Sequence, residues 1–111
     1  MQVLKFGGTS VGSPQAIEAT IQILSRQLQS GPLLAVVSAF GGVTDNLIRC
    51  GQLAASGDET FRDEVEQLTQ RHLSAIKQLV PIQQQSSLLS AIKTLCNEVE
   101  DICNGIFLLG E

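Results

Sequence analysis

The chain opens with a short apolar strand that runs straight into a lysine, two glycines and two hydroxyl side chains, Met1-Gln2-Val3-Leu4-Lys5-Phe6-Gly7-Gly8-Thr9-Ser10. Glycines in such a loop let backbone N–H groups approach an anion closely. A helix after the loop adds the positive end of its dipole, Lys5 adds a full charge, and Thr9 and Ser10 add short donors. The pattern predicts a phosphate-binding loop. Because the lysine precedes the glycines, the loop is neither G-x-x-x-x-G-K-[ST] nor G-x-G-x-x-G.

A strand–helix–strand unit is predicted over residues 2–37, with its first strand at residues 2–6. Ser13-Pro14 supplies a helix N-cap and a proline at the first helical position. The apolar face of this helix comprises Ile17, Ile21, Leu24 and Leu28. Ser30-Gly31-Pro32 ends the helix, and residues 33–37 form a continuous apolar run typical of a strand covered on both faces. Such a unit predicts a parallel strand pair with a right-handed crossover.

A second Gly-rich loop, Ser38-Ala39-Phe40-Gly41-Gly42, follows the second strand, and Thr44-Asp45 opens a helix that runs to about Ser56. Ligands of open parallel sheets bind outside the carboxyl ends of the strands, so both loops are expected to converge on one pocket. Its donors are numerous and its acids and bases few, which suits phosphoryl transfer. A plainer interpretation stays open: each Gly-Gly pair simply turns the chain, and Thr44 or Asp45 merely caps a helix.

Two long helices in an antiparallel hairpin are predicted after Gly57-Asp58, with no strand over residues 58–106. The apolar stripe of the first comprises Phe61, Val65, Leu68, His72, Ile76 and Leu79. That of the second comprises Leu88, Ile92, Leu95, Val99, Ile102 and Ile106. Residues 81–87 are expected to separate the helices, with the glutamines at 83–85 as a polar turn. Residues 1–57 would then carry the loops, and residues 58–111 the hairpin.

Composition limits the class of protein. The 111 residues form one domain or part of one, and a hydrophobic fraction of 43% suits a globular core. Four Phe, with no Trp or Tyr, weaken the case for stacking on bases or sugars. A net charge of −4 with no basic run argues against nucleic acid as a partner. With no signal peptide and no apolar run approaching a membrane span, the expected location is the cytoplasm.

Several reactive side chains are expected to be structural. Cys50, Cys96 and Cys103 show no Cys-x-x-Cys spacing, so they are expected to be small buried apolar residues rather than metal or redox sites. His72 lies on an apolar stripe and is expected to be packed or partly exposed. The acidic residues that begin the first hairpin helix suit a solvated helix N-terminus better than a metal site. No metal ligands are predicted.

Two motifs and the closing segment resemble those of the aspartokinases. The run from Val3 to Val11, Val-Leu-Lys-Phe-Gly-Gly-Thr-Ser-Val, is similar to the opening signature of that family, and it is the most specific of the three. The run from Val36 to Leu47 is similar to its second motif. The closing run from Gly105 to Glu111 resembles the segment that leads toward a third. The resemblance spans the whole chain, which would cover only the start of the family's kinase domain.

The resemblance implies a three-layer α/β/α fold and transfer of the ATP γ-phosphoryl, with Mg²⁺, to the side-chain carboxylate of L-aspartate. This is the first step of aspartate-family (lysine, threonine and methionine) biosynthesis. By motif, Lys5 would neutralise charge on the transferring phosphoryl, and Gly7 and Gly8 would approach the phosphates, with Thr9 and Ser10 as further donors. Ser38 and Thr44 would lie at the aspartate side of the pocket.

The resemblance also leaves parts of the site unassigned. Gly110-Glu111 is expected not to be the family's substrate-binding glutamate, which lies in a later Gly-Glu, and no Mg²⁺ ligands are visible. The chain alone is therefore expected to be inactive and to self-associate. A fusion to homoserine dehydrogenase, as in bifunctional aspartokinases, stays open. Two alternatives are another amino-acid kinase with a different acceptor and a non-catalytic module whose helical hairpin is an interaction surface.

Overall fold

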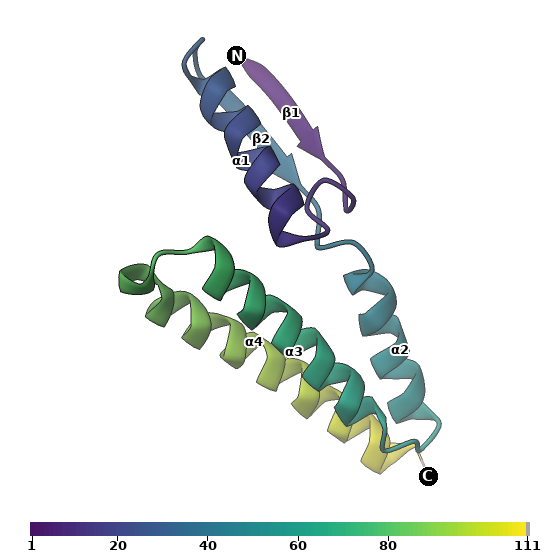
Figure 1. The fold of residues 1–111 in the computed structure, drawn as a ribbon. Coiled ribbons are helices and arrows are strands. Elements are labelled where there is room, and N and C mark those ends of the chain that lie inside the picture. The colour runs from purple at the N-terminus through teal and green to yellow at the C-terminus, as the bar shows by residue number, and fades with distance from the viewer. Residues whose placement is uncertain (111) are drawn as a thin grey trace. The chain divides into compact units, whose positions relative to one another are not determined.

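The computed structural model describes residues 1–110, and the chain divides into two compact units, the first spanning residues 1–43 and the second beginning at Thr44 (Figure 1). The elements in chain order are β1 (Gln2–Phe6), α1 (Pro14–Leu28), β2 (Leu33–Val37), α2 (Val43–Ala55), α3 (Phe61–Leu79) and α4 (Ile82–Leu109). A parallel β-α-β unit therefore precedes a helical region, as predicted. Glu111, the second residue of the Gly110-Glu111 pair, lies outside the described residues.

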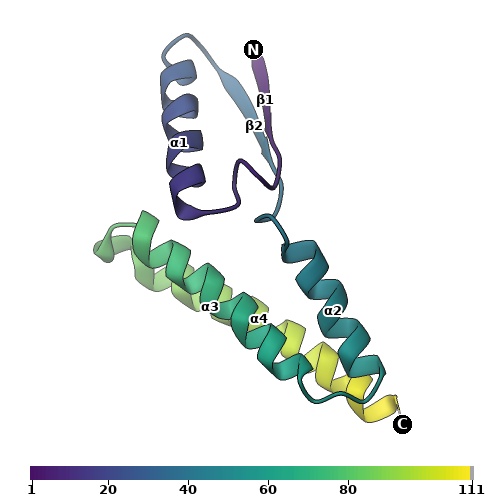
Figure 2. The ribbon, with the colours of Figure 1, turned by 45° about the vertical axis from the view of Figure 1, so that its right-hand side comes forward.

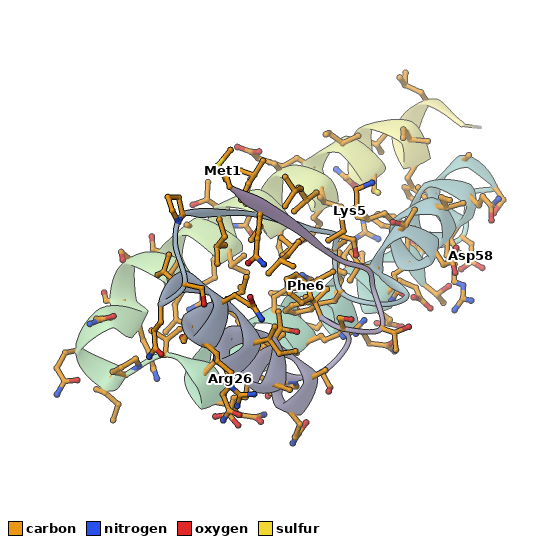
Figure 3. The ribbon with its side chains drawn as sticks, turned by 90° about the horizontal axis from the view of Figure 1, so that it is seen from above. Met1, Lys5, Phe6, Arg26 and Asp58 are labelled. Atoms are coloured by element: carbon orange, nitrogen blue, oxygen red, sulfur yellow. The ribbon has the colours of Figure 1, made fainter. Side chains whose placement is uncertain are left out.

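The first unit is a parallel pair of strands with α1 on one face (Figure 2). The register pairs Gln2 with Leu33 and Phe6 with Val37, and the Ser38 N–H donates to the Phe6 carbonyl over 3.1 Å. Successive side chains point to opposite faces of a strand, and Figure 3 shows Lys5 and Phe6 on opposite sides of β1. Phe6 is half-buried, whereas Lys5 is exposed.

The other face of this sheet is open. Val3, Leu34 and Val36 share it in the observed register and are 57%, 51% and 43% exposed. The prediction that residues 33–37 are covered on both faces is therefore wrong, since one helix covers one face of two strands. The face of α1 is also covered only in part, because Ile21 and Leu28 are exposed. A further layer of structure packed on this face would cover the exposed apolar side chains.

Helix α1 begins as its sequence indicates. The Ala16 N–H donates to the Ser13 Oγ over 3.1 Å, and Pro14 occupies the first helical position. Both features satisfy or remove an N–H that would otherwise lack a helical partner. The cap fixes where the first loop ends and the helix starts.

The second unit holds the best-formed core of the chain. Cys50 and Ala54 from α2, Phe61 and Val65 from α3, and Cys103 from α4 form one buried cluster. Figures 1 and 2 show α3 and α4 lying antiparallel, with the end of α2 beside the start of α3. All three cysteines are buried, as predicted.

The turn before α3 is organised by Asp58, labelled in Figure 3. The backbone N–H and the hydroxyl of Thr60 donate to Asp58 Oδ1 over 2.9 and 2.7 Å. These hydrogen bonds favour the carboxylate, so they lower the pKa of Asp58. The stabilisation is present above the ordinary carboxyl pKa and is lost as the pH falls through the lowered value.

The predicted separation of the hairpin helices at residues 81–87 is wrong. Only Val80 and Pro81 lie between α3 and α4, and the glutamines at 83–85 form the first turn of α4 rather than a polar turn. The Gln85 side-chain amide donates to the Val80 carbonyl over 2.7 Å and to the Lys77 carbonyl over 3.3 Å. Gln85 thus satisfies carbonyls at the end of α3, which explains why the chain turns without a longer loop.

The predicted apolar stripe of α4 packs only in part, because Val99 and Ile106 lie against the buried cluster while other members of the stripe are exposed. Leu88, Leu95 and Ile102 are 44%, 55% and 65% exposed. The buried residues of this helix are Cys96 and Cys103. The apolar residues of α4 thus form two stripes, and one of them repeats every seven residues on the exposed surface, a spacing that suits a second helix.

On α3 the buried residues include Leu73 and Ala75, while His72 is half-buried. The His72 Nδ1 lies 2.8 Å from the Leu68 carbonyl one turn earlier. This position matches the structural role expected for the ring. Within residues 1–110, no helix is both long enough and apolar enough to cross a membrane.

Candidate functional site

The candidate site is built on the carboxyl end of β1. Lys5 is the second-last residue of that strand, its side chain is exposed, and it forms no ion pair within the described part of the chain (Figure 3). A lysine held on a strand but without a carboxylate partner keeps its full charge available for an anion. The role of Lys5 in binding phosphate stays a prediction.

The two Gly-rich loops meet through their backbones. A Cβ on Gly8 would lie 3.2 Å from the Gly41 Cα, and one on Gly41 would lie 3.0 Å from the Gly8 carbonyl oxygen. A Cβ on Gly12 would lie 2.9 Å from the same oxygen. Side chains at these positions would push the loops apart, so glycine is what allows this approach. The convergence of the loops, expected from the parallel strand pair, is present in the structure.

The first loop is held by its own backbone and by α1. The Val11 N–H donates to the Gly7 carbonyl, and the Gly12 N–H donates to the Thr9 carbonyl, both over 3.3 Å. The Thr20 hydroxyl donates to the Ser10 carbonyl over 2.9 Å, and the Thr20 side chain is only 6% exposed. Thr20 thus fixes the loop to the helix that follows it.

Sequence reasoning missed Thr20. The available signal was a hydroxyl residue next to Ile21 in the helix that follows the loop. A buried threonine needs a hydrogen-bond partner, and the only clue was that the preceding loop could supply a free carbonyl.

The second loop turns sharply after β2. The Val43 N–H donates to the Phe40 carbonyl over 3.0 Å, and Gly42 has a φ of 86°, which favours glycine. The Ser38 hydroxyl donates to the neighbouring Ala39 carbonyl over 2.8 Å. Thr44 is exposed in the first turn of α2 and is the first residue of the second unit.

The chemistry available around these loops is that of anion binding. Neither residues 1–13 nor residues 38–44 contain an Asp or a Glu, whereas they contain a lysine, several hydroxyl residues and five glycines at 7, 8, 12, 41 and 42. Thr9 and Ser10 are exposed. A loop without carboxylates, next to a lysine in the sequence, does not repel an anion such as phosphate. The roles of the individual side chains stay predictions.

Metal binding by protein carboxylates finds no support in the described residues. Among residues 1–110, no group of three or more His, Cys, Asp or Glu is arranged to hold a metal ion.

We expect Gly41→Ala to destabilise the first unit by about 1–3 kcal/mol, because the new methyl group meets backbone that cannot rotate away. Gly7→Ala is the matched control, since a Cβ there meets nothing within 4 Å. The measurement is urea unfolding followed through the amide signals of β1 and β2. Equal stability of the two variants would show that the loops separate at little cost.

Comparison with known proteins agrees with this arrangement of strand, lysine and paired Gly-rich loops. Residues 1–106 match the model of the amino acid kinase family, so the chain belongs to that family, and its β-α-β unit is the start of an amino-acid kinase fold. The chain is 30% identical to aspartokinase 1, chloroplastic, of Arabidopsis thaliana over 98% of its length, which covers 18% of that protein.

Two further relatives match the chain, one over a shorter stretch and the other at lower identity. The chain is 38% identical to the aspartokinase of Chlamydia trachomatis over 69% of its length and 16% of that protein. It is 27% identical to bifunctional aspartokinase/homoserine dehydrogenase 2, chloroplastic, of Zea mays over 97% of its length and 12% of that protein. The chain thus spans less than a fifth of each of these three relatives. The resemblance to aspartokinases in the sequence is confirmed.

Proposed function

We propose that the chain is the amino-terminal part of an aspartate kinase domain, which transfers the ATP γ-phosphoryl to the side-chain carboxylate of L-aspartate. The observation that carries the proposal is the close backbone approach of Gly8 and Gly41 after two strands, the first of which carries Lys5, a lysine with no ion pair among residues 1–110. The names of the relatives support aspartate as the acceptor. Residues 1–57 would supply these loops, and residues 58–111 the helical hairpin.

The proposed mechanism relies on position and charge. Lys5 meets the negative charge on the transferring phosphoryl, and the backbones of Gly7 and Gly8 lie against the phosphates, with Thr9 and Ser10 as further donors. Ser38 and Thr44 bind at the aspartate side. ATP enters with Mg²⁺, which neutralises phosphate charge; the residues of this chain orient the nucleotide. Preorganised donors of this kind stabilise charge that develops in the transition state.

The test of this function is a titration of the isotopically labelled chain, followed residue by residue by nuclear magnetic resonance. ATP is expected to shift the amide signals of Lys5 to Ser10, and L-aspartate those of Ser38 and Thr44. L-Glutamate in place of L-aspartate tests the alternative of another amino-acid kinase. If millimolar ATP leaves the first loop unchanged, the loop does not bind phosphate in this chain and the proposal is wrong.

The isolated chain is expected to be inactive, because it matches less than a fifth of the kinases that it resembles. The assay traps aspartyl phosphate with hydroxylamine as the hydroxamate, in the presence of ATP, Mg²⁺ and L-aspartate. A complete aspartokinase under the same conditions is the positive control. Hydroxamate formed by the pure 111-residue chain would show that these loops suffice for transfer.

We also propose that the chain forms homo-oligomers. The open sheet face with Leu34 and the exposed stripe of α4 with Leu95 both leave apolar side chains in water. Sedimentation over a dilution series is expected to show a mass that falls on dilution. Leu34→Lys and Leu95→Lys separate the two surfaces, because only the variant at the contact surface lowers the mass. A monomer at every concentration would contradict the proposal.

The alternative function, a non-catalytic module that interacts through its helical hairpin, is favoured by the exposed apolar stripe of α4.

The proposed location is the cytoplasm, and the plant relatives named above are chloroplastic proteins. Fluorescent tagging of the complete protein in its own cell would distinguish an organelle from the cytoplasm.

A further inference from the structure

Two of the three cysteines come together although they are far apart in the chain. Cys50 lies on α2 and Cys103 on α4, and both belong to the one buried cluster of the second unit. Their side chains are 0% and 5% exposed, and both are free thiols. Burial is the main cause that raises the pKa of Cys50, and the charge of a Cys103 thiolate is the next. Cys50 and Cys103 therefore belong to the same small buried cluster, which α2, α3 and α4 form together.

The third cysteine is not part of this arrangement. Cys96 is buried on α4 but lies outside the cluster that contains Cys50 and Cys103. It is seven residues from Cys103 on one helix, so the two Cα atoms are separated by about 10 Å along the axis. Two cysteines need Cα atoms within about 7 Å to form a disulfide. Cys96 cannot pair with Cys103, which makes it a matched control.

We propose that Cys50 and Cys103 form a redox-sensitive dithiol, and that its oxidation to a disulfide ties α2 to α4. The sequence alone did not indicate this pairing, because the cysteines show no local spacing motif. It arises only when α2 and α4 pack at the cluster around Phe61. The tie joins two helices of one unit, so its formation requires no rearrangement between the two units.

The oxidant is a low-molecular-weight disulfide such as oxidised glutathione. The Cys103 thiolate attacks one sulfur of this disulfide, forms a mixed disulfide and releases one glutathione. The Cys50 thiolate then attacks the Cys103 sulfur and releases the second glutathione. The two protein thiols lose two electrons and two protons, which the two glutathione thiols carry away.

Burial makes this exchange slow and conditional. Burial raises the pKa of both thiols, and the thiolate is the attacking form. Oxidation therefore needs a transient opening of the packing between α2 and α4, and Cys103, the more exposed of the two, reacts first. Because α2 begins at the second loop and carries Thr44, the tie would also restrain that helix. An effect of this restraint on substrate binding through Thr44 rests on the proposed function, whereas formation of the disulfide does not.

The test exposes the folded chain to oxidised glutathione, alkylates the remaining thiols and maps the peptides by mass. We expect a Cys50–Cys103 link, with Cys96 alone alkylated, and a midpoint of thermal unfolding higher by roughly 10 °C, reversed by dithiothreitol. Cys96→Ala should keep the link and the shift. Cys50→Ala and Cys103→Ala should lose both, and the wild-type comparison stands even if either variant fails to fold.

Three results would overturn the proposal. One is a folded chain whose cysteines all stay reduced at a glutathione ratio that oxidises the unfolded chain. Another is a product with only single glutathione adducts or with links between chains. The third is a Cys50–Cys103 link that leaves the unfolding midpoint unchanged or lowers it. None of these results depends on kinase activity, so failure here leaves the proposed function untouched.

Discussion

In an active kinase that contains this segment, Lys5→Ala is expected to lower kcat by on the order of 10²-fold or more while KM for ATP changes far less. The reason is that Lys5 is proposed to meet the charge that develops on the phosphoryl during transfer. Its exposed side chain forms no ion pair within residues 1–110, so its removal breaks no structural contact of that kind. The loss should therefore appear in the chemical step rather than in folding.

A conservative variant and a control variant sharpen the test of Lys5. Lys5→Arg should restore only part of kcat, because a planar guanidinium replaces a compact ammonium. Lys93→Ala removes an exposed lysine of α4 and should leave both constants near their original values. Steady-state kinetics at saturating L-aspartate measures all three. A kcat close to the original in Lys5→Ala would remove this lysine from the mechanism, whatever happens to KM.

The strands and loops of the first unit were predictable from sequence. Residues 2–6 and 33–37 were expected as strands, and the structure has β1 at Gln2–Phe6 and β2 at Leu33–Val37. The first run ends directly at Gly7-Gly8, and the second is apolar throughout and begins after Gly31-Pro32, so their limits depend on local composition. The Ser13-Pro14 cap was visible for the same reason. What the sequence could not show is that Gly8, Gly12 and Gly41 approach within contact distance, because that depends on the strand register.

The helices of the second unit were predictable from the sequence, but the faces on which they pack were less so. The spacing of apolar residues predicted two helices, yet α4 carries apolar residues on two stripes, and periodicity alone does not choose between them. The packed face combines the buried Cys96 and Cys103 with the half-buried Val99 and Ile106, whereas Leu95 is exposed. Gln85 closes the turn through side-chain hydrogen bonds, which a polar composition does not distinguish from a loop.

The second large effect is expected in stability: Phe61→Ala should lower the free energy of unfolding of the helical unit by about 3–5 kcal/mol. Phe61 is 0% exposed in the cluster, and its ring centroid lies 5.6 Å from that of Phe107. The Arg62 guanidinium lies 4.7 Å from the Phe61 ring centroid and 5.5 Å from that of Phe107. Truncation removes both aromatic contacts and leaves a cavity between α2, α3 and α4.

The Phe61 prediction is measured by urea unfolding followed by far-ultraviolet circular dichroism, which reports on the helices. A loss of this size is a large share of the roughly 5–15 kcal/mol that holds a domain folded, so the midpoint should move far toward low urea. Ile102→Ala is the matched control: its side chain is also apolar but 65% exposed, and the expected change is within about 0.5 kcal/mol. If both variants lose the same stability, the core of this unit does not lie around Phe61; if only Phe61→Ala loses it, the buried cluster shared by α2, α3 and α4 is what keeps the unit folded.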